Sequence, residues 1–204
     1  MIKRIIFDLD NTLIPYPKSF EKAYIPYLKK YNLNITPLEL YKLVGTYENY
    51  HNIYTYDLLL ELINKNLNTS LGKEFLDEFI DIYDKLDEPL DKDVIETLKY
   101  LSSKYSLVVL TNWFTNSQKN RLKNTKILDY FDEVYGGDLV KTKPNEEAFI
   151  KTMGKFKPSE CISIGDRIKY DIEPAEKLGI KTYLLGESDK YDTINKISDL
   201  KELL

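Results

Sequence analysis

The sequence has few of the residues that build disulfides and thiolate metal sites. Among 204 residues there is one cysteine and one histidine. Cys161 alone forms neither an internal disulfide nor a cysteine metal cluster, so we expect a reducing compartment and a buried structural thiol. His51 has no neighbouring thiol or carboxylate pair and is assigned no role.

Long apolar runs and blocks of one charge sign are missing as well. No stretch approaches the ~20 apolar residues of a membrane span, and the apolar run before the first carboxylate is only three residues long. We therefore expect a cytoplasmic protein without a membrane segment. The 29 basic and 33 acidic residues give a net charge of −4 without a long block of either sign, which disfavours a nucleic-acid polymer as partner. An anionic small molecule would be held by local donors in a pocket.

Short apolar runs alternate with helical patterns in most of the chain. The runs Arg4–Asp8, Leu107–Leu110, Cys161–Ile164 and Lys181–Leu185 are typical of buried parallel strands. Helical faces are marked by Ile95, Leu98 and Leu101, by Ala148, Ile150 and Met153, and by Ile172, Ala175 and Leu178. This alternation predicts an α/β fold with a parallel sheet. Ligands bind such sheets outside the carboxyl ends of the strands.

One segment, residues 16–88, interrupts this alternation. It contains four helical patterns and no convincing strand: Phe20–Tyr31, Pro37–Tyr47, Tyr54–Asn66 and Lys73–Leu86. Pro15 and Pro17 on one side and Pro89 on the other suit the two crossings, because proline ends helices and stiffens linkers. We therefore predict a helical domain, 16–88, inserted into a core made of 1–15 and 89–204.

Two carboxylates stand two residues apart where the first predicted strand ends. Asp8 can attack phosphorus and form an aspartyl-phosphate, and Asp10 can protonate the leaving oxygen and later take a proton from water. Alone, the pair is weak evidence, because Asp-x-Asp also occurs in turns, helix caps and metal sites.

Three further motifs follow in the chain. Thr111 and Asn112 can hold phosphate oxygens, although Thr111 could instead cap the next helix. Lys143, in Lys-Thr-Lys-Pro-Asn, can neutralise a phosphoryl group, although loop lysines are usually just solvated. Asp166 and Asp171, in Gly-Asp-Arg-Ile-Lys-Tyr-Asp, offer carboxylates to a hard cation, and the preceding glycine permits a tight turn. Alone, these acids could simply favour a helix N-terminus.

The four motifs in this order resemble the haloacid dehalogenase superfamily, in particular its subfamily I phosphatase-like hydrolases with a C1-type helical cap. The resemblance implies a Rossmann-like sheet with helices on both faces and a helical-bundle cap, here 16–88, after the first strand. It also implies Mg²⁺ bound by the Asp8 carboxylate, the Asp10 backbone carbonyl and Asp166, with Asp171 holding these ligands in place. Trp113 stands where a smaller residue is more usual.

The activity that the resemblance implies is hydrolysis of a small phosphorylated metabolite. Asp8 and Asp10 would be catalytic, and Thr111, Asn112 and Lys143 would bind the phosphate. Three alternatives stay open: a phosphomutase, a 2-haloacid dehalogenase, against which Asp10 argues, and a non-catalytic phosphate-binding relative. A monomer or homodimer is expected. Aromatic side chains such as Trp113, Phe114, Tyr47, Tyr50, Tyr54 and Tyr56 could stack on a substrate, but packing is favoured for most of them.

Overall fold

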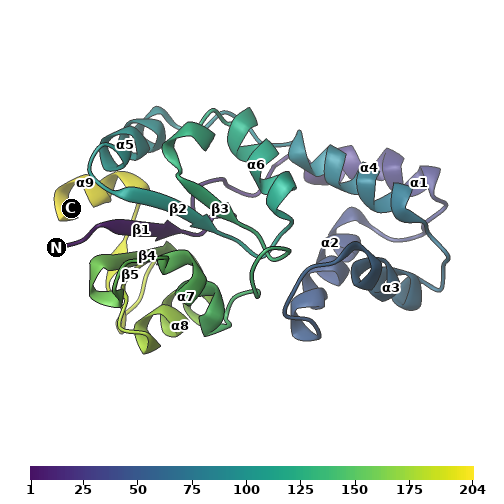
Figure 1. Cartoon of the computed structure of the whole chain (residues 1–204). Helices are drawn as coiled ribbons and strands as arrows, with labels where there is room; N and C mark the ends of the chain where they lie inside the picture. The colour runs from purple at the N-terminus through teal and green to yellow at the C-terminus, as the bar shows by residue number, and fades with distance from the viewer.

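A parallel six-stranded sheet lies at the centre of the protein in the computed structural model, which describes residues 1–204. The strand order is β3-β2-β1-β4-β5-β6 (Figure 1). The strands are β1 (Arg4–Phe7), β2 (Ser106–Leu110), β3 (Glu133–Tyr135), β4 (Cys161–Gly165), β5 (Lys181–Leu185) and β6 (Thr193–Ile194). The predicted parallel α/β fold is confirmed. β3 and β6 were not predicted, since runs of two or three residues carry no readable period.

The first strand lies in the interior of the sheet, paired on both sides. Arg4 is in register with Ser106 of β2 and with Cys161 of β4. All four β1 residues are buried, which is why the strand is a continuous apolar run apart from Arg4. Directly after β1, the backbone N–H of Asp8 donates to the carbonyl of Ile164 at 2.8 Å. This hydrogen bond fixes the backbone at the end of β1, from which the Asp8 side chain extends.

Helices cover both faces of the sheet (Figure 1). On one face lie α5 (Lys92–Ser102), α6 (Thr115–Asn124) and α9 (Leu200–Leu203), which share a core cluster with Ile5 and Phe7. On the other lie α7 (Glu146–Met153) and α8 (Glu173–Lys177), packed with Ile6 and Val108. The prediction that Ile150 faces the core is wrong: its side chain is 51% exposed, and Phe149 is buried instead.

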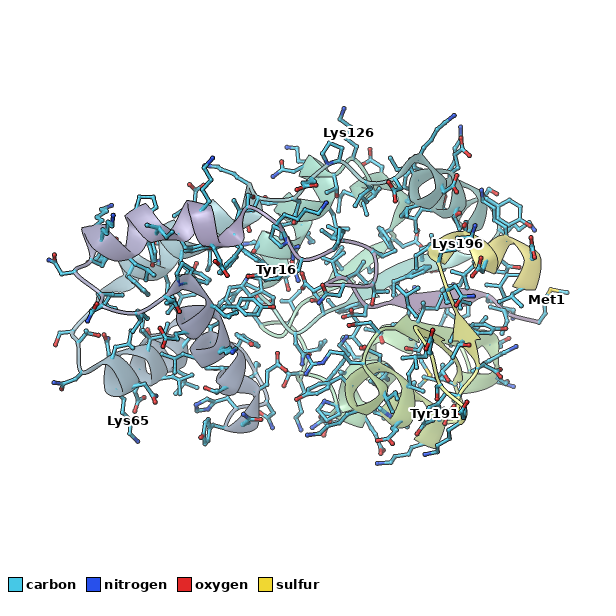
Figure 2. All side chains as sticks on the ribbon, turned by 180° about the vertical axis from the view of Figure 1, so that it is seen from behind. Met1, Tyr16, Lys65, Lys126, Tyr191 and Lys196 are labelled. Carbon is cyan, nitrogen blue, oxygen red and sulfur yellow. The ribbon has the colours of Figure 1, made fainter.

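Four α-helices between β1 and α5 form what we call the helical segment, residues 20–84. They are α1 (Phe20–Lys30), α2 (Pro37–Gly45), α3 (Tyr56–Leu67) and α4 (Lys73–Asp84), with a short 3₁₀ turn at Thr46–Asn49. Figure 1 shows them beyond the end of the sheet to which the strands point. Figure 2 shows Tyr16 where the chain passes between the two parts, with Lys65 and Met1 toward opposite ends of the molecule. None of the helices is both long and apolar enough to cross a membrane.

Local sequence explains where these helices begin and end. Thr36 and Glu39 form a reciprocal capping box at the start of α2, with Pro37 in the first turn. Thr55 caps α3 by accepting a hydrogen bond from the N–H of Leu58. Asn68 ends α3 in the left-handed conformation, with φ of 51°.

Candidate active site

The predicted site residues meet at the carboxyl ends of the strands. Asp8 follows β1, Thr111 follows β2, and Asp166 follows β4. One cavity of about 390 Å³ is lined by Asp8, Asp10, Thr111, Asn112, Lys143 and Asp171. Asp166 does not line it, but one of its carboxylate oxygens lies within 4.8 Å of oxygens of Asp8 and Asp171. The topology thus brings together residues up to 163 positions apart in the sequence, Asp8 and Asp171.

A buried lysine bridges two of the carboxylates. Lys143 Nζ donates to Asp8 Oδ1 at 2.6 Å and to Asp171 Oδ1 at 2.5 Å. Burial raises the pKa of Asp8 to about 7, while Lys143 pulls the pKa down. Burial lowers the pKa of Lys143, but Asp171 and Asp8 raise it by more, so the ammonium stays charged. The alternative that Lys143 is a solvated loop lysine does not fit, because its side chain is buried and bound to two carboxylates.

The carboxylates of Asp8, Asp166 and Asp171 could hold a metal ion. Each offers an oxygen, and the three oxygens lie within 4.8 Å of one another. The Thr12 hydroxyl contacts Asp8 Oδ2 at 2.9 Å and Asp166 Oδ1 at 3.4 Å. Burial, assisted by Asp171, raises the pKa of Asp166. An all-oxygen donor set of this kind fits Mg²⁺ better than a softer metal.

Asp171 is held close against the backbone of β4. A Cβ atom added to Gly165 would lie 2.3 Å from Asp171 Cγ, so no larger residue fits there. Gly165 is not among the residues with positive φ, so the close approach of Asp171, rather than a left-handed backbone, is the physical reason for a glycine here. The N–H of Arg167 donates to Asp171 Oδ2 at 3.0 Å. Asp171 is therefore placed by Lys143 and this N–H together.

Thr111 and Asn112 have different partners. The Asn112 side-chain amide forms two hydrogen bonds with the backbone of Lys143: it accepts one from the Lys143 N–H at 2.7 Å and donates one to the Lys143 carbonyl at 2.8 Å. The Thr111 hydroxyl accepts from Gln118 Nε2 at 2.8 Å. The N-cap position of α6 belongs to Phe114, so Thr111 does not cap that helix. Asn112 thus orients the loop that carries Lys143, while Thr111 faces the cavity.

Two α6 residues that sequence reasoning missed hold Asp10. Gln118 Nε2 donates to Asp10 Oδ2 at 2.7 Å, and the Arg121 guanidinium contacts Asp10 Oδ1. Both side chains are completely buried, although the sequence of α6 is strongly polar. Their spacing was the available signal, because Gln118, Arg121 and Leu122 fall at i, i+3 and i+4 on one helical face.

The far wall of the cavity comes mainly from the helical segment and is aromatic. It includes Tyr41, Tyr54, Phe79 and Tyr83, with Trp113 from the loop after β2. Trp113 is only 9% exposed and packs within the hydrophobic cluster of the helical segment, together with Phe114, Tyr47 and Tyr54. Tyr56 is partly buried against this cluster, and Tyr50 is exposed. Packing thus accounts for most of the aromatic residues considered, and a subset also forms the wall.

One carboxylate in this wall was not predicted. Glu48, in the 3₁₀ turn after α2, lines the cavity and accepts a hydrogen bond from the Tyr54 hydroxyl at 3.3 Å. Burial raises the pKa of Glu48, while Asn112, Arg167 and Lys143 act in the opposite direction. A single glutamate between Tyr47 and Asn49 in a helical region gives no sequence signal of its own.

Comparison with known proteins shows similarity to a hydrolase family and to phosphatases within it. The model of the haloacid dehalogenase-like hydrolase family matches residues 5–185. The chain is 27% identical to glyceraldehyde 3-phosphate phosphatase of Methanothermobacter thermautotrophicus, covering 100% of both chains. It is 28% identical to phosphoglycolate phosphatase of Aquifex aeolicus, covering 98% of this chain and 95% of that one. The crystal structure of the HAD-hydrolase YfnB from Bacillus subtilis matches it with a TM-score of 0.78 at 17% identity, covering 100% and 98%.

The parallel sheet has Asp8 and Asp166 at the ends of two adjacent strands, and the buried Lys143 bridges Asp8 and Asp171, which defines a Rossmann-like α/β fold with a charged site at its carboxyl edge. The chain belongs to the haloacid dehalogenase-like hydrolase family.

Proposed function

We propose that this protein is a Mg²⁺-dependent phosphate-monoester hydrolase that acts through an aspartyl-phosphate on Asp8. The observation that carries the proposal is the placement of Asp8 at the end of an interior strand, 2.6 Å from Lys143 Nζ and within 4.8 Å of two further carboxylates. Membership of a hydrolase family and full-length similarity to phosphatases support the reaction class.

In this proposal the reaction has two steps, formation and hydrolysis of the aspartyl-phosphate on Asp8. In the first, a carboxylate oxygen of Asp8 forms a bond to phosphorus as the bond to the leaving oxygen breaks, and Asp10 gives that oxygen a proton. In the second, Asp10 takes a proton from water, which attacks phosphorus and releases phosphate and Asp8. Lys143 offsets the charge of the phosphoryl group, and Thr111 donates to one of its oxygens. Asp8, the Asp10 carbonyl and Asp166 would hold Mg²⁺, with Asp171 supporting them, and the ion would supply positive charge that offsets the repulsion between carboxylate and phosphate.

Residues 16–88 act in this proposal as a cap that supplies selectivity. The helical segment provides most of the aromatic cavity wall. Two backbone hydrogen bonds join it to the loop before Lys143: Tyr54 N–H to the Gly137 carbonyl at 2.7 Å and Thr142 N–H to the Asn52 carbonyl at 2.8 Å. Such a wall excludes bulk water from the leaving group.

The other activities account less well for the site. A dehalogenase of this family needs no proton donor at position 10, yet Asp10 is held by buried donors from α6. A phosphomutase must hold a sugar bisphosphate, but apart from Lys143 the cavity is lined by a single cationic side chain, Arg167, for the second phosphate. A non-catalytic relative would have no use for a complete set of nucleophile, acid, lysine and metal carboxylates.

The substrate in this proposal is a small phosphorylated metabolite whose leaving group carries hydroxyl or carbonyl groups, as a triose phosphate does. A relative that matches the full chain is named for glyceraldehyde 3-phosphate. Glu48 in the cavity wall can accept a hydrogen bond from a hydroxyl and would repel a carboxylate-bearing leaving group such as that of phosphoglycolate.

The test is phosphate release from a panel of phosphorylated metabolites, measured with Mg²⁺ and with excess chelator. We expect Mg²⁺-dependent release, with glyceraldehyde 3-phosphate ranked above phosphoglycolate. No release from any phosphate monoester, including an aryl phosphate, would contradict the proposed reaction. The reverse ranking would contradict only the substrate class.

A further inference from the structure

The strongest unexplained feature is the set of buried donors around Asp10. The Arg121 guanidinium and the Tyr83 hydroxyl, the latter at 3.3 Å, both contact Oδ1. Gln118 Nε2 alone contacts Oδ2, at 2.7 Å. Oδ1 therefore has both lone pairs engaged, whereas Oδ2 keeps one free.

Arg121 is itself fixed from three sides. It forms a fork with Asp87, Nε to Oδ2 at 2.8 Å and Nη2 to Oδ1 at 2.9 Å. Nη1 also donates to Gln118 Oε1 at 2.9 Å, and the guanidinium lies over the Tyr83 ring at 4.5 Å. A planar guanidinium held by a bidentate partner has little freedom to rotate. Asp87, between α4 and α5, therefore orients the Arg121 guanidinium, which in turn orients Asp10.

Gln118 connects Asp10 with Thr111. Its Nε2 group carries two protons, and the two acceptors in reach are Asp10 Oδ2 at 2.7 Å and Thr111 Oγ1 at 2.8 Å. Since Oγ1 accepts from Gln118, the hydroxyl proton of Thr111 is left to point elsewhere. One amide therefore sets the orientation of both the proposed proton donor and a proposed phosphate ligand.

We propose that Gln118 and Arg121 are positioning residues that hold Asp10 so that Oδ2 carries the proton delivered to the leaving oxygen. The inference rests on the proposed function. In the first step the proton leaves Oδ2 for the leaving oxygen as the phosphorus–oxygen bond breaks, and the carboxylate that results keeps its donors on both oxygens. In the second step Oδ2 recovers a proton from water.

The test compares two leaving groups in single-turnover formation of the phosphoenzyme. An aryl phosphate such as p-nitrophenyl phosphate needs little protonation, whereas an alkyl phosphate such as glycerol 3-phosphate needs a positioned acid. We expect Gln118→Met and Arg121→Lys each to raise the aryl-to-alkyl rate ratio about 10-fold, part of the ~10²- to 10⁴-fold that acid–base catalysis contributes. Asp10→Asn should raise the ratio further.

A double-mutant cycle separates positioning from structural damage. In the Asp10→Asn background, Gln118→Met should no longer change the ratio, because its effect passes through Asp10. Thr125→Val is the matched control, since Thr125 is a buried α6 residue whose hydroxyl contacts only the backbone carbonyls of Arg121 and Leu122. It should leave the ratio unchanged even if it lowers the melting temperature.

The possible results separate failure of the positioning role of Gln118 and Arg121 from failure of the proposed mechanism. If Asp10→Asn does not raise the ratio, Asp10 is not the acid, and the proposed mechanism fails together with the inference. If Asp10→Asn raises it but Gln118→Met and Arg121→Lys lower both rates equally, the positioning role is overturned while the mechanism stands. Arg121→Lys keeps the buried charge beside Asp87, and Gln118→Met adds none, so both variants are expected to fold.

Discussion

The sheet and the helical segment contribute different chemistry to one cavity. The loops at the strand ends supply the charged groups Asp8, Asp10, Lys143 and Asp171. The helical segment supplies Tyr41, Tyr54, Phe79 and Tyr83, and from its turn the single carboxylate Glu48. Parallel strands end at one edge and can bring several charges together, whereas helices present broad packed surfaces. The difference separates the proposed phosphoryl-transfer groups from those proposed to contact the leaving group.

The two regions also build their cores differently. The core around β1 is mainly aliphatic, with Ile5, Leu107 and Ile162 among its members. The core of the helical segment is rich in aromatic residues, whose hydroxyls are paired inside it: Tyr24 donates to the Phe79 carbonyl at 2.6 Å and Tyr27 to the Phe75 carbonyl at 2.7 Å. A buried tyrosine is tolerated where its hydroxyl finds an acceptor. Many of the 17 tyrosines thus serve packing.

The largest expected effect comes from Asp8, the proposed nucleophile at the edge of the sheet. Asp8→Asn should abolish turnover and phosphoenzyme formation, because an amide is a poor nucleophile and a weaker metal ligand. Mass spectrometry of acid-quenched protein after exposure to an aryl phosphate measures this. Asp129→Asn, at an exposed aspartate, is the control and should keep full activity. Phosphate found on the Asp8→Asn protein would show that another residue is the nucleophile.

Removal of Mg²⁺ should have the next largest effect on activity. It should not alter the helical segment, because the three carboxylates that could hold the ion lie outside it. Excess chelator is expected to stop phosphate release, and added Mg²⁺ to restore it, because three carboxylates crowd within 4.8 Å. Calcium should inhibit, since its longer bonds and higher coordination number misplace Asp8. Undiminished activity in chelator would rule out the metal assignment.

A pair of core substitutions tests whether the two regions are separate in stability. Trp113→Ala removes a side chain that the loop after β2 contributes to the aromatic cluster, and Phe131→Ala removes one of equal exposure, 9%, from the cluster around β1. Each should cost about 3–5 kcal/mol locally. Hydrogen exchange should increase mainly in residues 20–84 for the first variant and mainly in β1 and β2 for the second. Equal changes in both regions would show one cooperative unit.

The smallest expected effect concerns the carboxylate of the cavity wall. Glu48→Gln removes the negative charge but keeps an acceptor for the Tyr54 hydroxyl. We expect kcat/KM for phosphoglycolate to rise a few-fold relative to glyceraldehyde 3-phosphate, as for about 1 kcal/mol of relieved repulsion. Glu39→Gln, in the exposed capping box of α2, is the control. An unchanged ratio would remove Glu48 from substrate selection.

Most of the sheet and the charged motifs could be predicted from the sequence, because buried parallel strands are apolar runs that end in polar residues. The long strands β1, β2, β4 and β5 were found in this way. The short β3 and β6 were not, since two or three residues depend on their neighbours for strand structure. The same holds for Gln118 and Arg121, whose burial depends on Asp10 lying more than 100 residues away.

The predicted boundary of the inserted domain shows a related limit. The range 16–88 follows helical periodicity and prolines, and it stays a prediction. Within it, the side chain of Asp87 is bound to Arg121 of α6, and Asp84 accepts a hydrogen bond from Asn120 at 2.8 Å. Periodicity locates elements along the chain, but it cannot show which side chains cross from one part to the other.

The strand order has a consequence for the timing of synthesis. β1 leaves the ribosome before its two partners, β2 and β4, whose residues paired with Arg4 lie 102 and 157 positions later. Most contacts within the helical segment span far shorter distances in sequence, and low contact order favours early folding. We therefore expect the part of the aromatic wall that the helical segment supplies to fold while β1, which leads to Asp8, still lacks its partner strands. The reactive carboxylates come together only after β4 and Asp171 have emerged, so this chain acquires its chemistry among the last events of its own assembly.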